Sequence, residues 1–164
     1  MRGNNMNINI ICLGKLKEKY LLDGVNEYLK RINKYATIKI IELPDEVIPE
    51  NASQKEIENI QKTEAEKIQK HVKPQDYNIA LDLTGKQLTS EEFANKIQDI
   101  TLKGFSTINF IIGGTTGLYR ELVINCQFIF SFSKLTFPHQ LMRLFLTEQL
   151  FRAFKIIHHE KYHW

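Results

Sequence analysis

Short apolar runs rich in β-branched residues alternate with stretches of helical character along this chain, and that alternation limits the folds it can adopt. Between the runs, apolar residues recur every three or four positions, which is typical of amphipathic helices. Strands that are separated by helices pair in parallel and are covered by those helices. The pattern therefore predicts an α/β fold with a mainly parallel sheet and helices on both faces. The predicted strands are residues 7–14, 36–43, 77–83, 106–112 and 127–133.

Three of the predicted helices carry specific start signals. Ser53 with Glu56, and Thr89 with Glu92, have the spacing of a capping box, in which each residue satisfies a free backbone N–H of the first helical turn. Pro138 suits the first turn of a long final helix, because its missing N–H has no partner there in any case. A turn is predicted at residues 84–86, directly after the third strand.

The chain has 164 residues, which is enough for one hydrophobic core. We interpret residues 1–5 as a polar N-terminal extension and residues 6–164 as a single domain. No apolar segment reaches the length of a membrane span, and the N-terminus lacks the apolar core of a signal peptide. We therefore expect a cytoplasmic protein with no membrane partner. Cys12 and Cys126 share no CxxC spacing and are expected to be small buried residues.

Three strand ends carry a glycine turn or an unusual polar loop, and ligands of parallel sheets bind beyond the carboxyl ends of strands. These are residues 84–86 (TGK), 113–117 (GGTTG) and 131–140 (SFSKLTFPHQ). The glycine turn either presents backbone N–H groups to a ligand or is only a tight connection between a strand and a helix. Neither GxGxxG nor GxxxxGK[ST] occurs in the chain, so a dinucleotide or nucleoside triphosphate is a poor candidate.

Two other catalytic patterns are weak. Residues 159–163 (HEKYH) formally match the metalloprotease pattern HExxH. That zinc site needs both histidines on a supported helix and a third ligand further along, yet only Trp164 follows, so we predict no metal site. Ser131 and Ser133 lie near His139 in the sequence, but no GxSxG motif surrounds either serine.

The charged residues of the final helix allow two interpretations. Glu148 and Arg152 are one helical turn apart and are expected to pair at the surface. Arg143 has no partner at that spacing, so it is either a ligand or phosphate contact or a solvated arginine. The formal net charge is only +3, which by itself does not indicate nucleic-acid binding.

Several motifs, in this order and spacing, resemble the RlmH family of SPOUT-class methyltransferases. They are GKLKEKY at 14–20, LDLTGK at 81–86, IIGGTTGL at 111–118, FSFSKLTFPHQLMRLFLTEQLFRAFKI at 130–156 and the final YH at 162–163. The resemblance extends from about Met6 to the C-terminus.

The resemblance implies a fold in which the C-terminal part of the α/β sheet forms a deep trefoil knot. It implies a homodimer that uses S-adenosyl-L-methionine to methylate N3 of a pseudouridine in 23S rRNA, in the stem-loop at the ribosomal subunit interface. Whether the substrate is the assembled ribosome or free rRNA stays open. Such a cofactor carries no phosphate, which agrees with the missing phosphate-binding motifs.

The resemblance also implies site residues. Cofactor contacts are expected from Leu81, from Gly113, and from a loop that comprises Phe132, Ser133, Lys134, Leu135, Thr136 and Phe137. His139, Tyr162 and His163 are candidates for the general base or for orienting the substrate, and Arg143 for a contact with RNA. We hypothesise that His163 acts across the dimer interface.

The C-terminus departs from the family pattern in two places. Trp164 stands where a basic residue commonly follows Tyr-His, and His158 with His159 stands where Arg-Gly is frequent. The loss of these cations leaves an alternative open. In that alternative, the chain is a catalytically weak RNA- or ribosome-binding relative that keeps the knotted cofactor fold.

Overall fold

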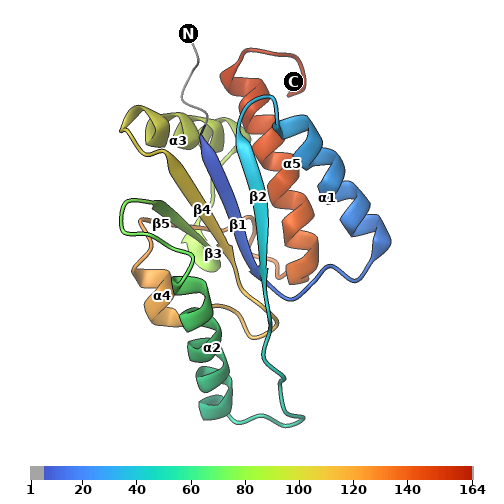
Figure 1. Ribbon diagram of the computed structural model, residues 1–164, viewed down its shortest axis with the longest axis vertical. Helices are drawn as coiled ribbons and strands as arrows, with labels where there is room; N and C mark the ends of the chain where they lie inside the picture. Colours follow the sequence, from blue (N-terminus) through green and yellow to red (C-terminus); the bar gives the residue numbers. More distant parts are fainter. Residues whose placement is uncertain (1–5, 164) are drawn as a thin grey trace.

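The computed structural model describes residues 6–163 and contains a five-stranded sheet flanked by helices (Figure 1). Residues 1–5, interpreted as an extension, and Trp164 lie outside the described residues. The predicted alternation of strands and helices is confirmed. In chain order the elements are β1 (Asn7–Leu13), α1 (Lys19–Ile32), β2 (Thr37–Leu43), α2 (Gln54–Gln69), β3 (Tyr77–Lys86), α3 (Ser90–Leu102), β4 (Thr107–Ile112), α4 (Arg120–Ile124), β5 (Phe128–Phe130) and α5 (His139–Ile157).

The strands lie in the order β2-β1-β4-β3-β5, and every neighbouring pair is parallel. The carboxyl ends of all the strands therefore lie along one edge of the sheet. Since the predicted glycine turn and polar loops follow β3, β4 and β5, this order brings them to neighbouring positions on that edge.

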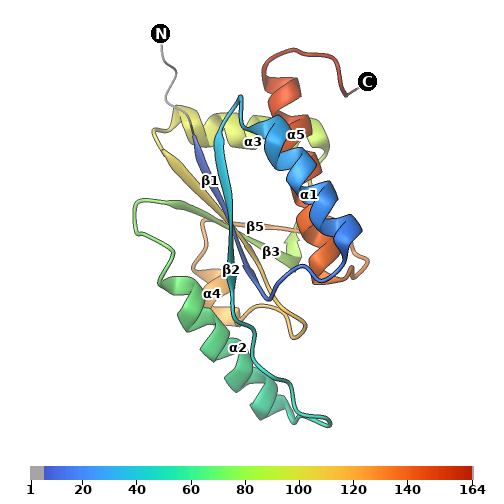
Figure 2. The ribbon, with the colours of Figure 1, turned by 45° about the vertical axis from the view of Figure 1, so that its right-hand side comes forward.

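Helices cover both faces of the sheet, as predicted, but not equally. α1, α3 and α5 pack on one face, and α2 with α4 packs on the other (Figure 2). The core under α1, α3 and α5 is the larger one and includes Ile8, Ile10, Phe110, Leu146 and Leu150. The core under α2 and α4 is smaller and lies near the carboxyl ends of the strands; it comprises Ile11, Leu13, Ala65, Ile68, Ile111 and Leu122.

Both predicted capping boxes are present. The Ser53 hydroxyl accepts a hydrogen bond from the Glu56 backbone N–H at 3.2 Å, and the Glu56 carboxylate accepts one from the Ser53 N–H at 2.6 Å. Thr89 and Glu92 make the same reciprocal pair at the start of α3. No helix within residues 6–163 is long and apolar enough to cross a membrane.

The end of β3 differs from the prediction. A turn was expected at residues 84–86, but the chain makes an irregular excursion after Leu81 and rejoins the sheet with Lys86 opposite Phe130. A side chain at Gly85 could not be accommodated, since its Cβ would lie 2.6 Å from the backbone of Ile129 and Phe130. β5 ends at Phe130, earlier than expected, because Ser131 begins a turn in which its hydroxyl donates to the Ser133 carbonyl at 2.8 Å.

Arg143 on α5 is fully buried and joins this helix to the ends of two strands. Its guanidinium donates to the Glu42 carboxylate at 2.7 Å and to the carbonyls of Leu13 and Gly14 at 2.9 and 2.8 Å. The interpretation of Arg143 as unpaired is therefore wrong. Its partner is not on the same helix but at the end of β2, 101 residues earlier in the chain.

Replacing Arg143 should destabilise the protein. In Arg143→Met, the carbonyls of Leu13 and Gly14 lose their donor, and Glu42 loses its cation. The Glu42 side chain is 37% exposed, so water can partly replace that cation. We therefore expect the free energy of unfolding to fall by about 3 kcal/mol, which is near the low end for a broken buried ion pair. Urea denaturation measures this change. Arg120→Met is the control, since Arg120 makes one exposed hydrogen bond, to Thr84, and should change stability by about 0.5 kcal/mol or less. Equal stability of the two variants would contradict the anchoring role of Arg143.

Candidate functional site

A cavity of about 510 Å³ lies beyond the carboxyl ends of β3, β4 and β5. Its walls come from three segments that are far apart in the sequence: residues 81–84, 112–118 and 130–139, with Met142 added from the first turns of α5. These are the strand ends that the sequence predicted as ligand sites. A volume of this size is typical of pockets for small molecules and cofactors.

The predicted cofactor contacts converge on this cavity, with one exception. Leu81, Gly113, Phe132, Ser133, Leu135, Thr136 and Phe137 all line it. Lys134 is exposed and is not among the residues that line the cavity. The geometry thus brings together the segments proposed for one ligand, and it leaves the only lysine of the loop outside.

The glycine turn after β4 is closed on itself. The Gly117 N–H donates to the Gly114 carbonyl at 3.1 Å, and Gly117 has a positive φ of 82°. The two limbs of the turn approach so closely that a Cβ on Gly113 would lie 2.8 Å from the Gly117 carbonyl carbon. Gln61 on α2 supports the turn from behind by donating to the Thr116 carbonyl at 2.5 Å. Backbone groups rather than side chains therefore form this wall.

Internal contacts hold the loop between β5 and α5 in place. The Ser133 hydroxyl accepts from the Leu135 N–H at 3.0 Å, and the Phe137 ring packs edge-on against Phe145 with centroids 5.4 Å apart. Pro138 directly precedes α5, and its carbonyl accepts from the Met142 N–H at 3.2 Å. The loop is a fixed wall of the cavity.

The charges around the cavity exclude a phosphate-binding role. Among the described residues that line it, Asp82 and His139 are the only ones with ionisable side chains, and neither lysine nor arginine is present. Asp82 is oriented by the Thr84 N–H, which donates to its carboxylate at 3.0 Å. Such a cavity favours a ligand with a positive centre and apolar surface over a polyanion.

His139, the first residue of α5, is half-buried at the cavity wall. Burial lowers its pKa below the usual value, and the nearby positive charge of Arg143 lowers it further. The imidazole is therefore neutral at pH 7 and is available as a proton acceptor.

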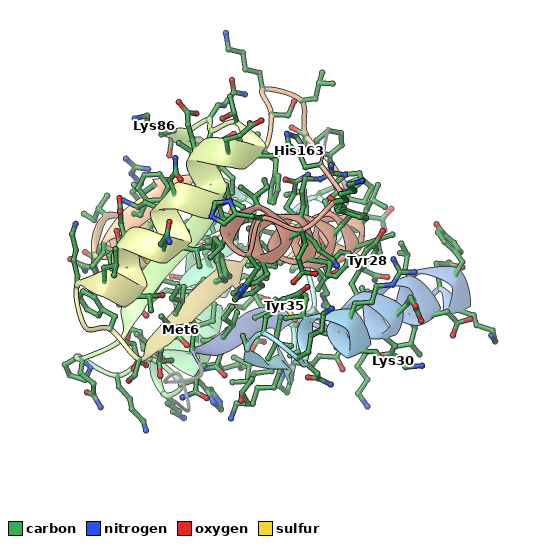
Figure 3. All side chains as sticks on the ribbon, turned by 90° about the horizontal axis from the view of Figure 1, so that it is seen from above. Met6, Tyr28, Lys30, Tyr35, Lys86 and His163 are labelled. Carbon is green, nitrogen blue, oxygen red and sulfur yellow. The ribbon has the colours of Figure 1, made fainter. Side chains whose placement is uncertain are left out.

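Tyr162 and His163 do not line the cavity of their own chain. The tail turns back beside α5 (Figures 1 and 3), where the Tyr162 hydroxyl donates to Glu148 at 3.0 Å. Arg152 donates to His163 Nδ1 at 3.1 Å, so the ring proton sits on Nε2 and faces the Glu91 carboxylate at 2.7 Å. The candidate catalytic residues are thus split, with His139 at the cavity and the other two in this tail network.

The same network corrects the expectation for Glu148 and Arg152. Glu148 and Arg152 do pair, at 2.5 Å, but as part of the half-buried tail network rather than as an isolated surface pair. Burial, followed by hydrogen bonds to Tyr28 and Glu148, raises the pKa of Tyr162, so this phenol stays protonated.

The HExxH match lacks the geometry of a zinc site. α5 ends at Ile157, and His159 has a positive φ of 54°, so the two histidines of the pattern do not share a helix face. Within residues 6–163, no three His, Cys, Asp or Glu side chains lie close enough to hold a metal ion. Cys12 and Cys126 are free, and burial raises the pKa of both thiols to about 11.

Arg143 is not presented to RNA. Its side chain has no exposed surface, and its two terminal nitrogens are bonded to Glu42, Leu13 and Gly14. A contact with RNA would require breaking all three bonds, and we do not propose it.

Several cavity residues were not predicted from the sequence, and Asp82 and Met142 are two of them. Both had a signal. Asp82 directly follows Leu81 at a strand end, and Met142 lies three positions after His139, on the same side of a helix.

Known proteins resemble this chain along nearly its whole length. A family model described as "Predicted SPOUT methyltransferase" matches residues 6–163. A protein of Desulforamulus reducens named ribosomal RNA large subunit methyltransferase H is 52% identical over 156 residues, which cover 95% of this chain and 98% of that protein. A protein of the same name from Streptococcus uberis is 52% identical over 158 residues, which cover 96% and 99%.

The fold is also found in a solved structure, a probable methylase family protein from Haemophilus influenzae Rd KW20. It matches with a TM-score of 0.52 at 14% sequence identity, over 97% of this chain and 71% of that one. The family model matches residues 6–163, the relatives are about 50% identical over nearly their whole length, and the fold is that of a probable methylase. The chain therefore belongs to the SPOUT methyltransferase family.

Proposed function

We propose that this protein transfers a methyl group from S-adenosyl-L-methionine to N3 of a pseudouridine in 23S rRNA, in the stem-loop at the ribosomal subunit interface. It would act in the cytoplasm, where assembled ribosomes are found. The observation that carries the proposal is the cavity, where strand-end segments predicted to bind a methyl donor converge and where the described lining contains no lysine or arginine. The names of the half-identical relatives support rRNA as the substrate class.

The residues that line the cavity fit this cofactor. Leu81, Phe132 and Leu135 offer apolar surface for an adenine ring, the glycine turn offers backbone groups for polar edges, and Asp82 offers a negative charge. S-adenosyl-L-methionine, when bound, supplies an electrophilic methyl group on a positively charged sulfur. The absence of cations from the described lining matters here, since a lysine would repel that sulfur.

The chain's own contribution to the reaction is positioning and proton transfer. Formation of the bond from N3 to the methyl carbon requires that N3 lose its proton. His139 is neutral, lies on the cavity wall and can accept that proton at its free ring nitrogen. The fixed loop before α5 would hold the cofactor beside the substrate, and such positioning lowers the barrier to the reaction.

We further propose a homodimer in which the tail of one subunit completes the site of the other. The side chains of Tyr20, Leu22 and Leu135 are 68%, 44% and 68% exposed, which is unusual for residues of this size. An apolar hollow of about 480 Å³ lies between α1, α5 and the cavity loop, lined by Tyr28, Phe132, Phe137, Leu144 and Phe145 together with Glu148 of the tail network. Pairing of this face in two copies would bring Tyr162 and His163 toward the partner's cavity.

The trefoil knot is part of the same proposal. Residues 130–139 meet residues 112–118 at the cavity. β5 is an edge strand of the sheet, yet α5, which follows it, packs across the sheet and reaches the carboxyl end of β1 through Arg143. This return path supports a chain that passes through the loop after β4.

The reaction is tested with purified protein, labelled S-adenosyl-L-methionine and ribosomes or free 23S rRNA from a strain that lacks the modification. We expect label at N3 of one pseudouridine. Gly113→Ala should weaken cofactor binding about tenfold or more, because its Cβ forces apart the limbs of the glycine turn. Gly114→Ala is the matched control, since its Cβ would make only ordinary contacts, at 3.6 Å or more. Calorimetry measures the cofactor affinity of each variant.

Three outcomes would count against the proposal. Binding of cofactor and ribosomes without transfer would favour the alternative of a catalytically weak relative with an altered tail. Label on another base or another nucleic acid would overturn the assignment to pseudouridine. Equal cofactor affinity in the two glycine variants would remove the cofactor from this cavity.

The role of His163 across the interface is tested by mixing two variants at a cofactor concentration well below the Kd of Gly113→Ala, so that each variant alone has little activity. Equal amounts of His163→Ala and Gly113→Ala form mixed dimers in which one site combines an intact cavity with the partner's intact tail. We expect recovery of about a quarter of the unaltered activity, since half of the dimers of this twofold assembly carry one of two sites. If the tail acted on its own subunit, the mixture would be as inactive as its components.

The knot is tested by pulling the chain from its two ends in a force experiment. A knotted chain tightens instead of opening, so the stretched length should fall clearly below the roughly 3.6 Å per residue that a fully extended chain reaches. Extension to the full length would show that the chain is not knotted.

A further inference from the structure

One part of the sheet is not covered by any helix of residues 6–163. α2 and α4 pack against the carboxyl ends of the strands, through Ile11, Leu13 and Ile111, and leave the amino-terminal ends on that face free (Figure 1). Met6, labelled in Figure 3, marks this end of β1. The uncovered part lies at the opposite end of the strands from the methyl-donor cavity.

The side chains on the uncovered part are polar, although strand residues at these positions in a covered sheet are apolar. The strand register aligns them in two rows across the sheet. Asn7 lies between Thr37 and Thr107 in the first row. In the second row, Asn9 lies between Lys39 and Asn109, and Asn78 follows Asn109.

A hydrogen-bond network makes this polar surface rigid. Asn109, which has no exposed surface, accepts from Asn9 at 2.9 Å and donates to Asn78 and to the Asp76 carboxylate, each at 2.9 Å. Asp76 also accepts from the Lys73 backbone N–H at 3.1 Å, which fixes the loop before β3 against the sheet. Burying an amide costs free energy unless the amide is hydrogen-bonded, and these hydrogen bonds offset that cost. They also hold the surface in one shape.

A recess of about 460 Å³ stands over this network, and cations surround it. Lys39 comes from β2, while Lys70, His71 and Lys73 come from the end of α2 and the loop that follows. None of the three lysines forms an ion pair within residues 6–163. Asp76 is the only acidic residue among the described residues of the lining. It is 5% exposed, and its carboxylate accepts a hydrogen bond from Asn109. The recess is therefore positively charged.

We propose that this recess binds backbone phosphates of the rRNA substrate, at a distance from the nucleotide that is methylated. The inference rests on the proposed function for its choice of partner. Lysines around a rigid amide floor suit a phosphodiester, which accepts hydrogen bonds and needs its charge balanced. β1 spans the sheet from recess to cavity with seven residues, about 20 Å at the usual rise, so the two sites would contact different phosphates of a large folded RNA.

This contact would position the enzyme rather than read sequence. The protein as a whole carries a formal charge of only +3, so a general attraction to RNA is weak. A local group of unpaired lysines in a fixed recess concentrates that attraction at one place and orients the docked protein. The cavity at the other end of the sheet then selects the base.

The test compares two double variants with the same loss of charge. Lys39→Gln/Lys73→Gln removes two cations from the recess, and Lys55→Gln/Lys62→Gln removes two exposed cations from α2 that do not line it. At about 0.1 M salt, we expect the recess variant to bind ribosomes about tenfold or more weakly, with a slope of log K against log salt that is smaller by about 0.7 to 0.9 per lysine. The control should lose much less.

Cofactor affinity and the unfolding midpoint should be unchanged in both variants, because all four lysines are exposed. Equal effects of the two variants would overturn the inference, as would a loss of affinity without a change of slope, because lysines that bind phosphates must displace counterions from the RNA. If the unaltered protein methylates its substrate normally and the recess variant binds ribosomes as tightly as the control variant, this inference is rejected and the proposed function stands. If the recess variant binds weakly but the unaltered protein transfers no methyl group, the proposed reaction fails and the RNA contact stands.

Discussion

The buried guanidinium of Arg143 joins the parts of the structure that matter for function. It is placed on α5, one turn after His139, and it binds the carboxyl ends of β1 and β2. A fully buried cation is costly unless its hydrogen bonds are met, and here one carboxylate and two carbonyls pair its two terminal nitrogens, while the buried Nε has no partner within the described residues. Because α5 starts at the cavity, this anchor determines where the cavity loop ends. The same charge helps to keep His139 neutral.

The local structure could be predicted from the sequence, because strands, helices and caps depend on spacing within a few residues. Ser53 with Glu56, and Thr89 with Glu92, are examples in which the pattern contains the whole interaction. The end of β3 could not be predicted, since Lys86 pairs with Phe130 across 44 residues of chain. The partner of Arg143 was hidden for the same reason: helical spacing says nothing about a carboxylate at the end of a distant strand.

The candidate site was predictable to the extent that it follows from topology. Parallel strands place their carboxyl ends together, so the turns after β3, β4 and β5 had to meet. No comparable rule predicts where the residues after α5 lie. His163 is held by Arg152 and Glu91, from two different helices, and only packing decides that arrangement. Asn7 and Asn9 alternate with isoleucines in β1, yet the alternation alone did not distinguish a polar recess from a covered face.

The two ends of the sheet are built for different work by the same strands. At the carboxyl ends, apolar residues and glycine backbone form a cavity whose described lining has no lysine or arginine, which suits a positively charged cofactor. At the amino ends, the residues of the same face change to asparagine and lysine, and a buried amide network lies beneath the recess that the lysines line. Under the proposed reaction and the proposed RNA contact, separating the cations from the cavity would avoid repulsion of the methyl donor and would leave positive charge for RNA. A single cluster of lysines beside the cavity would have served one of these needs at the expense of the other.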